Sequence, residues 1–109
     1  MYRATTPLHR FVFADDPSAY PVIKVTYAQG KRTIIEKDKE DLEFSSYTIP
    51  SGATRYTASL RLTQEETKLF TEGNTVMVQV RVLDESGHSY ASDVVLLTVK
   101  DVLNDEVLR

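Results

Sequence analysis

Val-Met-Val-Gln-Val-Arg-Val, residues 76–82, is the stretch that decides the fold class of this chain of 109 residues. Its valines occupy every second position, which is the period of a β-strand with one buried face. The same alternation recurs twice, in residues 56–62 with Tyr56, Ala58, Leu60 and Leu62, and in residues 23–27 with Ile23, Val25 and Tyr27. These three runs predict strands that each bury one face.

Shorter runs and turn residues extend this pattern along the chain. Residues 8–14, 32–37 and 44–49 are further candidate strands. Residues 90–99 are apolar on both faces at their centre, as in a strand that is covered on both sides or crosses between sheets. Turn chemistry separates the runs: Gln29-Gly30 predicts a hairpin of type I′, Asp84-Glu85-Ser86-Gly87 a longer hairpin turn, and Pro50-Ser51-Gly52 a break in mid-chain.

One segment departs from the β pattern. Thr63 and Glu66 have the spacing of a capping box, in which each side chain accepts a hydrogen bond from the other residue's backbone N–H. The box predicts a short helix. Leu69 and Phe70 are expected to face the core, and residues 73–74 (Gly-Asn) to end the helix with a left-handed cap.

Together these elements predict an all-β fold: an immunoglobulin-like antiparallel β-sandwich of about seven strands, with one short helix near residues 64–72. Leu60 and Val80 lie at the centres of the two clearest strands, so both are expected to be deeply buried. Residues 1–101 are assigned to the sandwich domain and residues 102–109 to a C-terminal tail. The tail either extends the last strand and frays, or docks on another subunit.

Composition narrows the classes of function. The chain has no cysteine, which excludes disulfides and thiolate chemistry and favours assembly inside a cell. A net charge of −3 and a pI near 5.3 give no overall attraction to nucleic acid or to anionic lipid. No window has the apolar length of a membrane span or the form of a signal peptide. We therefore expect no nucleic acid, no membrane and no general export route.

No catalytic residue, metal ligand or cofactor is predicted. The two histidines, His9 and His88, are far apart in the sequence and are interpreted as surface polar residues. Acidic residues gather in predicted turns, where carboxylates are solvated: Asp15 with Asp16, and residues 38–41 with Asp38, Glu40 and Asp41. A loop calcium site at residues 38–41 or 84–86 is an alternative, although neither segment has calcium-loop spacing.

Tyrosines and the tail are the candidates for contacts with other proteins. Tyr27, Tyr56 and the four phenylalanines are assigned to the core by their phase, which leaves Tyr2, Tyr20, Tyr47 and Tyr90 for the surface. The predicted interface residues are Tyr90 together with Val102, Leu103, Val107 and Leu108. In the tail these apolar residues share one face if the tail is helical. The expected partners are other protein subunits, further copies of the chain included.

A resemblance rests on five segments that span nearly the whole chain in order: residues 3–7 (RATTP), 25–29 (VTYAQ), 62–67 (LTQEET), 78–82 (VQVRV) and 101–108 (DVLNDEVL). In these segments the chain resembles a family of small proteins encoded by phages and prophages of gram-positive gut bacteria. The resemblance implies a non-enzymatic virion structural protein of the tail or baseplate region, with an immunoglobulin-like sandwich. It also implies assembly in the cytoplasm of the host bacterium and later residence in the virion.

A second interpretation is an immunoglobulin-like binding module that recognises carbohydrate or a cell-surface partner. Such modules usually come attached to an export signal or to a catalytic domain, and the chain shows neither pattern. A hydrolase is a third interpretation, for which the sequence offers no nucleophile–base pair.

Overall fold

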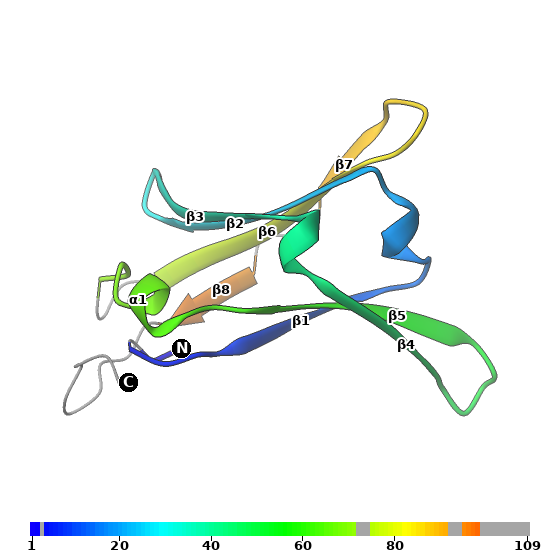
Figure 1. The fold of residues 1–109 in the computed structure, drawn as a ribbon, viewed down its shortest axis with the longest axis horizontal. Coiled ribbons are helices and arrows are strands. Elements are labelled where there is room, and N and C mark those ends of the chain that lie inside the picture. The colour runs from blue at the N-terminus through cyan, green and yellow to red at the C-terminus, as the bar shows by residue number, and fades with distance from the viewer. Residues whose placement is uncertain (3, 72–74, 92–94, 99–109) are drawn as a thin grey trace.

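The computed structural model describes residues 1–2, 4–71, 75–91 and 95–98 of the chain. Eight strands make up most of it (Figure 1). They are β1 (Leu8–Phe13), β2 (Val22–Gln29), β3 (Arg32–Asp38), β4 (Glu43–Thr48), β5 (Thr54–Arg61), β6 (Thr75–Leu83), β7 (Ser89–Ala91) and β8 (Val95–Thr98). Three short helices connect them: η1 (Pro17–Ala19), η2 (Lys39–Asp41) and α1 (Gln64–Thr67).

The strands form two antiparallel sheets. One sheet has the order β1-β5-β4, and the other has the order β3-β2-β6, with β7 and β8 both paired to β6. An immunoglobulin-like sandwich places its B, E and D strands in one sheet and its C, F and G strands in the other. Here β1, β5 and β4 take the places of B, E and D, while β2, β6 and the pair β7–β8 take those of C, F and G. The predicted all-β sandwich is confirmed.

The core lies between the two sheets and contains the residues that the alternation assigned to it. Side chains from β2, β5 and β6 are buried there together with Phe70, which follows α1. Leu60 on β5 is 2 % exposed and Val80 on β6 is 6 % exposed, so both expectations are confirmed. Phe11, Phe13 and Phe44 are only partly buried and pack against the edge of this core.

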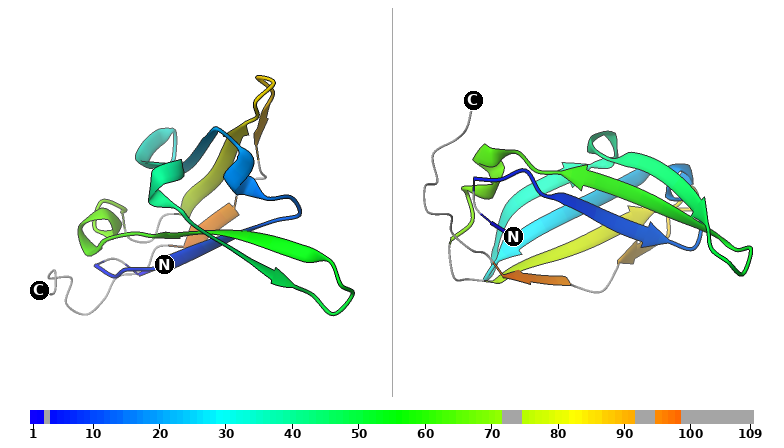
Figure 2. Two further views of the ribbon diagram at one scale, coloured as in Figure 1. Left: turned by 45° about the vertical axis from the view of Figure 1, so that its right-hand side comes forward. Right: turned by 90° about the horizontal axis from the view of Figure 1, so that it is seen from below.

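The sheets lie close at the end that carries α1 and diverge at the other end (Figures 1 and 2). The β4–β5 hairpin and the β6–β7 hairpin project from the body in different directions there. This divergence explains why Tyr56, although in phase with Ala58 and Leu60, is only half-buried. The alternation predicts which face a side chain joins, but burial also requires the opposite sheet to reach that far.

Two hairpin turns follow the same design. At Pro50-Ser51-Gly52 the Gly52 N–H donates to the Ile49 carbonyl at 2.9 Å, and Gly52 has a φ of +92°. At Asp84–Gly87 the Gly87 N–H donates to the Asp84 carbonyl at 3.1 Å, and Gly87 has a φ of +85°. Each is a three-residue loop that ends on a left-handed glycine.

The β2–β3 hairpin differs from its prediction. Gln29 pairs with Arg32, so the two loop residues are Gly30 and Lys31 rather than Gln29 and Gly30. Gly30 has a φ of +61°, and Lys31 is not among the residues with positive φ. A positive φ at the first central position alone belongs to a type II′ turn, so the predicted type I′ turn is wrong.

α1 begins as predicted but is shorter. The Glu66 N–H donates to Thr63 Oγ1 at 3.1 Å and the Thr63 N–H donates to Glu66 Oε1 at 2.9 Å, so the capping box is present. The helix ends at Thr67, within the predicted span of residues 64–72. Phe70 is buried as expected, whereas Leu69 is 60 % exposed, because two adjacent residues beyond a single helical turn do not share one face. Residues 73–74 lie outside the described residues.

Polar contacts attach α1 and the residues after it to β2 and β3 and to the N-terminal segment. The buried Thr67 hydroxyl donates to the Thr5 carbonyl at 3.0 Å and accepts from the Thr5 N–H at 3.1 Å. Lys37 Nζ on β3 lies 2.6 Å from Glu66 Oε2. Gln29 on β2 bonds both backbone groups of Thr71. These contacts fix the end of the sandwich where the chain crosses from β5 to β6.

Shortening Leu60 to alanine should lower the free energy of unfolding by about 2–5 kcal/mol, because it opens a cavity in the core. Leu69→Ala is the matched control, since the same atoms are removed from an exposed position. Chemical denaturation of both variants measures the difference. Equal losses would contradict the burial of Leu60.

Thr63→Ala should lower the free energy of unfolding by about 0.5–2 kcal/mol, because the Glu66 N–H loses its acceptor. Thr63→Ser keeps a hydroxyl at the cap and should retain most of that stability. Thermal unfolding followed by circular dichroism tests the pair. An unchanged Thr63→Ala variant would show that the capping box contributes nothing.

Candidate functional site

The face of the β1-β5-β4 sheet that points away from the core is called here the outer face, and it is turned toward the viewer in Figure 2 (right). Strand register sets its rows: Arg10, Ser59 and Glu43 lie side by side across the sheet, and so do Val12, Thr57 and Ser45. Ala58 and Leu60 point to the core. Side chains alternate along a strand, so Thr57 before Ala58 and Ser59 between Ala58 and Leu60 point outward.

The outer face is hollowed along its centre. A groove of about 630 Å³ is lined by side chains from all three strands. Its floor is the central strand β5, where Thr57 and Ser59 are small and the longer Arg61 stands at the strand end, and its sides carry the longer residues Arg10 of β1 and Tyr47 of β4. Thr57 is only 5 % exposed although it belongs to this outward-pointing row. Small residues flanked by large ones produce the hollow.

Both signs of charge lie along the groove. Arg10 and Arg61 come from β1 and β5, while Asp41 and Glu43 come from the end of η2 and the start of β4. Arg61 donates to the Thr6 carbonyl at 2.7 Å. Within the described part of the chain, neither the Arg10 nor the Glu43 side chain makes a hydrogen bond or an ion pair. These two groups can pair with a molecule bound on the face.

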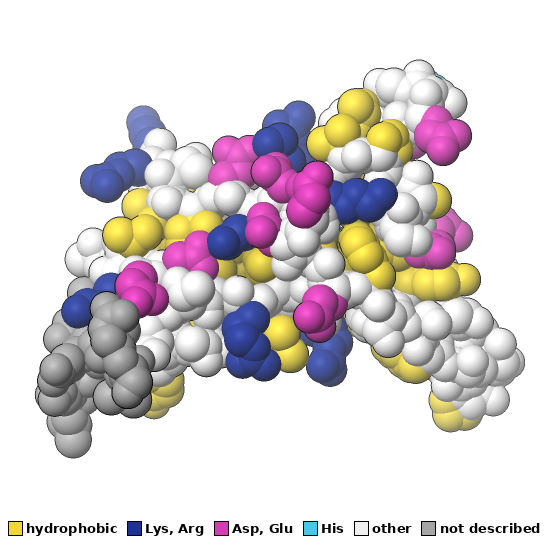
Figure 3. Space-filling view, viewed as in Figure 1, with side chains coloured by type: hydrophobic (Ala, Val, Ile, Leu, Met, Phe, Trp, Pro, Cys, Tyr) yellow, Lys and Arg dark blue, Asp and Glu magenta, His cyan; other side chains and the backbone are white. Residues whose placement is uncertain are grey.

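Large apolar side chains complete the outer face. Leu8 and Val12 of β1 and Tyr47 of β4 are all exposed. A surface that combines exposed apolar and aromatic groups with unpaired charges is typical of protein–protein interfaces. Elsewhere the charges are interspersed: on the face seen in Figure 3, Lys and Arg alternate with Asp and Glu. Lys24, for example, lies 3.2 Å from Glu36 and 3.0 Å from Asp38.

The predicted interface residues do not join this groove. Tyr90 is 55 % exposed on β7, opposite Val82 of β6, and so belongs to the other sheet. Val102, Leu103, Val107 and Leu108 lie outside the described residues, as does the whole predicted tail. Of the other tyrosines left for the surface, Tyr47 lines the groove, whereas Tyr20 is partly buried against the core.

The interpretation of His9 as a surface residue is wrong. His9 is half-buried, and its Nδ1 lies 2.6 Å from the hydroxyl of Tyr27, which is fully buried. Burial raises the pKa of Tyr27, so the phenol stays neutral and shares a hydrogen bond with the imidazole. Burial, followed by the charge of the N-terminal ammonium, lowers the pKa of His9. The contact joins β1 of one sheet to β2 of the other.

His88 is exposed as expected and belongs to a turn. Its backbone N–H donates to Asp84 Oδ1 at 2.8 Å, and the Ser86 N–H donates to the same atom at 2.9 Å. The bond from the His88 N–H is the main reason that the pKa of Asp84 is lowered. The Asp84 carboxylate therefore stabilises its own hairpin.

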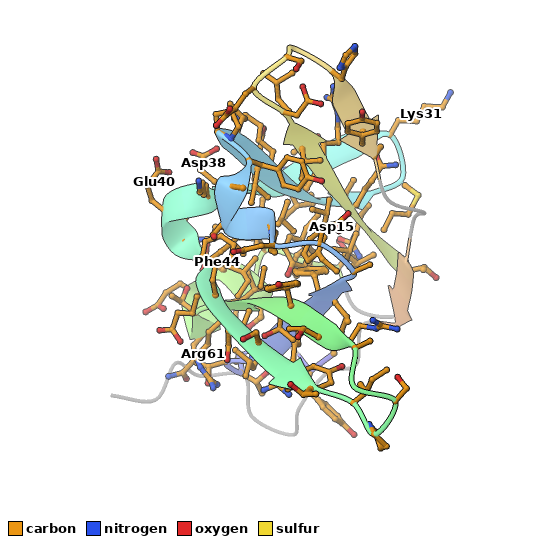
Figure 4. The ribbon with its side chains drawn as sticks, turned by 90° about the vertical axis from the view of Figure 1, so that its right-hand side faces the viewer. Asp15, Lys31, Asp38, Glu40, Phe44 and Arg61 are labelled. Atoms are coloured by element: carbon orange, nitrogen blue, oxygen red, sulfur yellow. The ribbon has the colours of Figure 1, made fainter. Side chains whose placement is uncertain are left out.

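The acidic residues of the other turns also serve local structure. Asp16 accepts from the Ser18 N–H at 3.0 Å, and Asp41 accepts from the Asp38 N–H at 3.0 Å. In Figure 4, Asp15 lies well apart from Asp38 and Glu40. Over the described residues, no three of the His, Cys, Asp and Glu side chains form a group that could hold a metal ion.

The sequence contained a partial signal for the groove. Thr57, Ser59 and Arg61 are the polar positions of a strand whose other face is apolar, which predicts that they point outward. The contribution of β1 could not be derived in the same way. It depends on the pairing of strands that lie some 50 residues apart in the chain, such as Arg10 with Ser59.

The chain matches no protein-family model, no curated protein and no solved structure. No helix in the described residues is long and apolar enough to cross a membrane.

The buried His9 makes stability depend on pH. An unfolded histidine takes up a proton near pH 6.5, whereas the lowered pKa of His9 delays this in the native state. As the pH falls below about 6.5 the unfolded state binds more protons, so the free energy of unfolding should decrease until the native His9 is protonated as well. Above about pH 6.5 the contribution of His9 is constant.

Denaturant titrations at several pH values test this dependence in three proteins. His9→Gln should remove most of the loss of stability that sets in below about pH 6.5, because glutamine does not titrate. His88→Gln, the matched control in an exposed turn, should retain it. The same slope in His9→Gln and in the unmodified protein would contradict the assignment.

Proposed function

We propose that this protein is a non-enzymatic structural component of a phage or prophage particle, from the tail or baseplate region, and that it acts through contacts with other protein subunits. The resemblance described above supports the phage assignment. The outer face supports the mode of action. In this proposal the protein assembles in the cytoplasm of the host bacterium and then resides in the virion, without a nucleic-acid or membrane partner.

The observation that carries the proposal is the composition of the outer face. Arg10 and Glu43 lie in one row on either side of the small Ser59, and the exposed Val12 and Tyr47 flank them along the strands. A protein surface can fill this groove with a side chain and pair both charges at once. Because the groove lies on hydrogen-bonded strands, its shape is largely fixed before binding.

Carbohydrate recognition is the second candidate. The exposed ring of Tyr47 stands beside a groove whose floor carries the hydroxyls of Thr57 and Ser59. An aromatic face next to hydroxyl groups can stack on a sugar ring and bond its hydroxyls. The open width of the groove and its two unpaired charges fit a protein surface better.

Mass spectrometry of particles purified from the strain that encodes the chain tests the proposal. The protein should be present in several copies per particle and should remain after a wash in high salt. Its absence from particles, together with its recovery as free protein in the lysate, would contradict the proposal. Binding of the purified protein to immobilised cell-wall glycans, lost in Tyr47→Ala, would favour the second candidate.

Double substitution Arg10→Ser and Glu43→Ser should reduce incorporation into particles by about tenfold or more, because both unpaired charges of the outer face are removed. Lys24→Ser with Glu36→Ser, on the other sheet, is the control that removes the same two charge types. The copy number per particle measures the effect. Equal incorporation of the two double variants would show that the outer face is not the contact surface.

A further inference from the structure

Strand β4 is an open edge of its sheet. The sheet order is β1-β5-β4, so β4 pairs with β5 on one side and with no described strand on the other. Beyond its first two residues it is exposed on both faces, because the β4–β5 hairpin projects past the other sheet (Figure 1). An open edge presents unpaired backbone N–H and C=O groups that can bind another strand.

The hydrogen bonds at the hairpin end show which backbone groups are unpaired. The Ile49 N–H donates to the Ala53 carbonyl at 2.9 Å, so Ile49 points its backbone groups toward β5. Alternation along an antiparallel ladder makes Tyr47 and Ser45 do the same. The backbone groups of the residues between them, Ser46 above all, therefore point away from β5 to the open side.

The opposite side of β5 supports this assignment independently. The Leu62 N–H donates to the Pro7 carbonyl at 3.1 Å, so the even-numbered residues of β5 bond β1. The odd-numbered residues of β5 therefore bond β4, where Thr57 pairs with Ser45 and Arg55 pairs with Tyr47. Two separate contacts thus give the same alternation.

The other edges carry features that discourage strand addition. β1 has Arg10 at its centre and Pro7 just before its start, and β3 has four charged residues among its seven. β7 and β8 are three and four residues long. β4 has six residues with a single charge, Glu43 at its first position, and no proline. Charges, prolines and short length are the usual protections of an edge, and β4 has the fewest.

From this open edge we infer that β4 pairs with β4 of a second copy of the chain, antiparallel about a twofold axis at Ser46. This register places the outward backbone groups of Ser46 opposite those of Ser46 in the second copy. Phe44 then lies opposite Thr48, and Ser45 opposite Tyr47. Glu43 meets no like charge in this register, whereas twofold pairing of β1 about its centre would set Arg10 against itself.

The pairing produces a closed dimer. A twofold contact uses the same edge on both copies, so no further β4 edge remains for a third chain. The two β1-β5-β4 sheets become one six-stranded sheet. A twofold axis perpendicular to the sheet keeps both outer faces on the same side, and the two grooves then form one extended surface.

This inference deepens the proposed function, on which it rests, by naming a partner: a second copy. Sedimentation velocity of the full chain measures it directly, and the unmodified chain should sediment as a dimer. Ser46→Lys and Ser46→Glu each place two like charges opposite one another at the axis, so each should raise the dimer dissociation constant about tenfold. An equimolar mixture of the two variants should restore dimers with one copy of each.

Ser51→Lys is the matched control, because it adds the same charge in the turn beyond the paired residues, and it should remain dimeric. Recovery of mixed dimers also shows that both Ser46 variants are folded. The inference would be overturned if the unmodified chain were a monomer, or if Ser46→Lys dimerised as tightly as the unmodified chain. A monomer that is still found in particles would overturn this dimer alone, whereas a dimer absent from particles would overturn only the proposed function.

Discussion

The hydrogen bond between His9 and the buried Tyr27 hydroxyl is the contact on which the rest of the structure depends. A phenol in the core needs a hydrogen-bond partner, because a buried hydroxyl without one lowers the free energy of unfolding. Its partner comes from the opposite sheet, at 2.6 Å, while the Tyr27 ring contacts Phe70 at a centroid distance of 6.1 Å. One side chain thus joins β1, β2 and the segment after α1.

This junction explains the shape of the molecule. Thr67, Glu66 and Gln29 add polar contacts at the same end, so the sheets are tied together where the chain crosses between them. Away from that end, Lys39 Nζ in η2 donates to the Ser18 and Tyr20 carbonyls at 2.8 and 2.7 Å, a contact between two connecting segments rather than between strands of the two sheets. The sheets diverge at the other end, and the β4–β5 hairpin extends beyond the core. The open edge follows from the sheet order β1-β5-β4, and the hollow of the outer face follows from the small Thr57 and Ser59 beside longer residues.

The sequence predicts those features that depend on neighbours along the chain. Alternation in β2, β5 and β6 identified the core residues, and the Thr63 capping box located the start of α1. Contacts between distant segments were not predictable. His9 looks isolated in the sequence because its partner lies 18 positions away on another sheet. Residues 90–99 were expected to form one strand; β7 and β8 both pair antiparallel with β6, and residues 92–94 between them lie outside the described residues.

β4 bonds β5 through alternate residues, which leaves the backbone groups of the other residues free to pair with a second chain. Amide hydrogen exchange of β4, followed by NMR at low and high protein concentration, tests it most directly. In dilute protein the amides of Ser45 and Tyr47 should be protected while those of Phe44, Ser46 and Thr48 exchange rapidly. At high concentration the second set should become protected as well. Uniform protection along β4 in dilute protein, or rapid exchange of the second set at every concentration, would contradict the account.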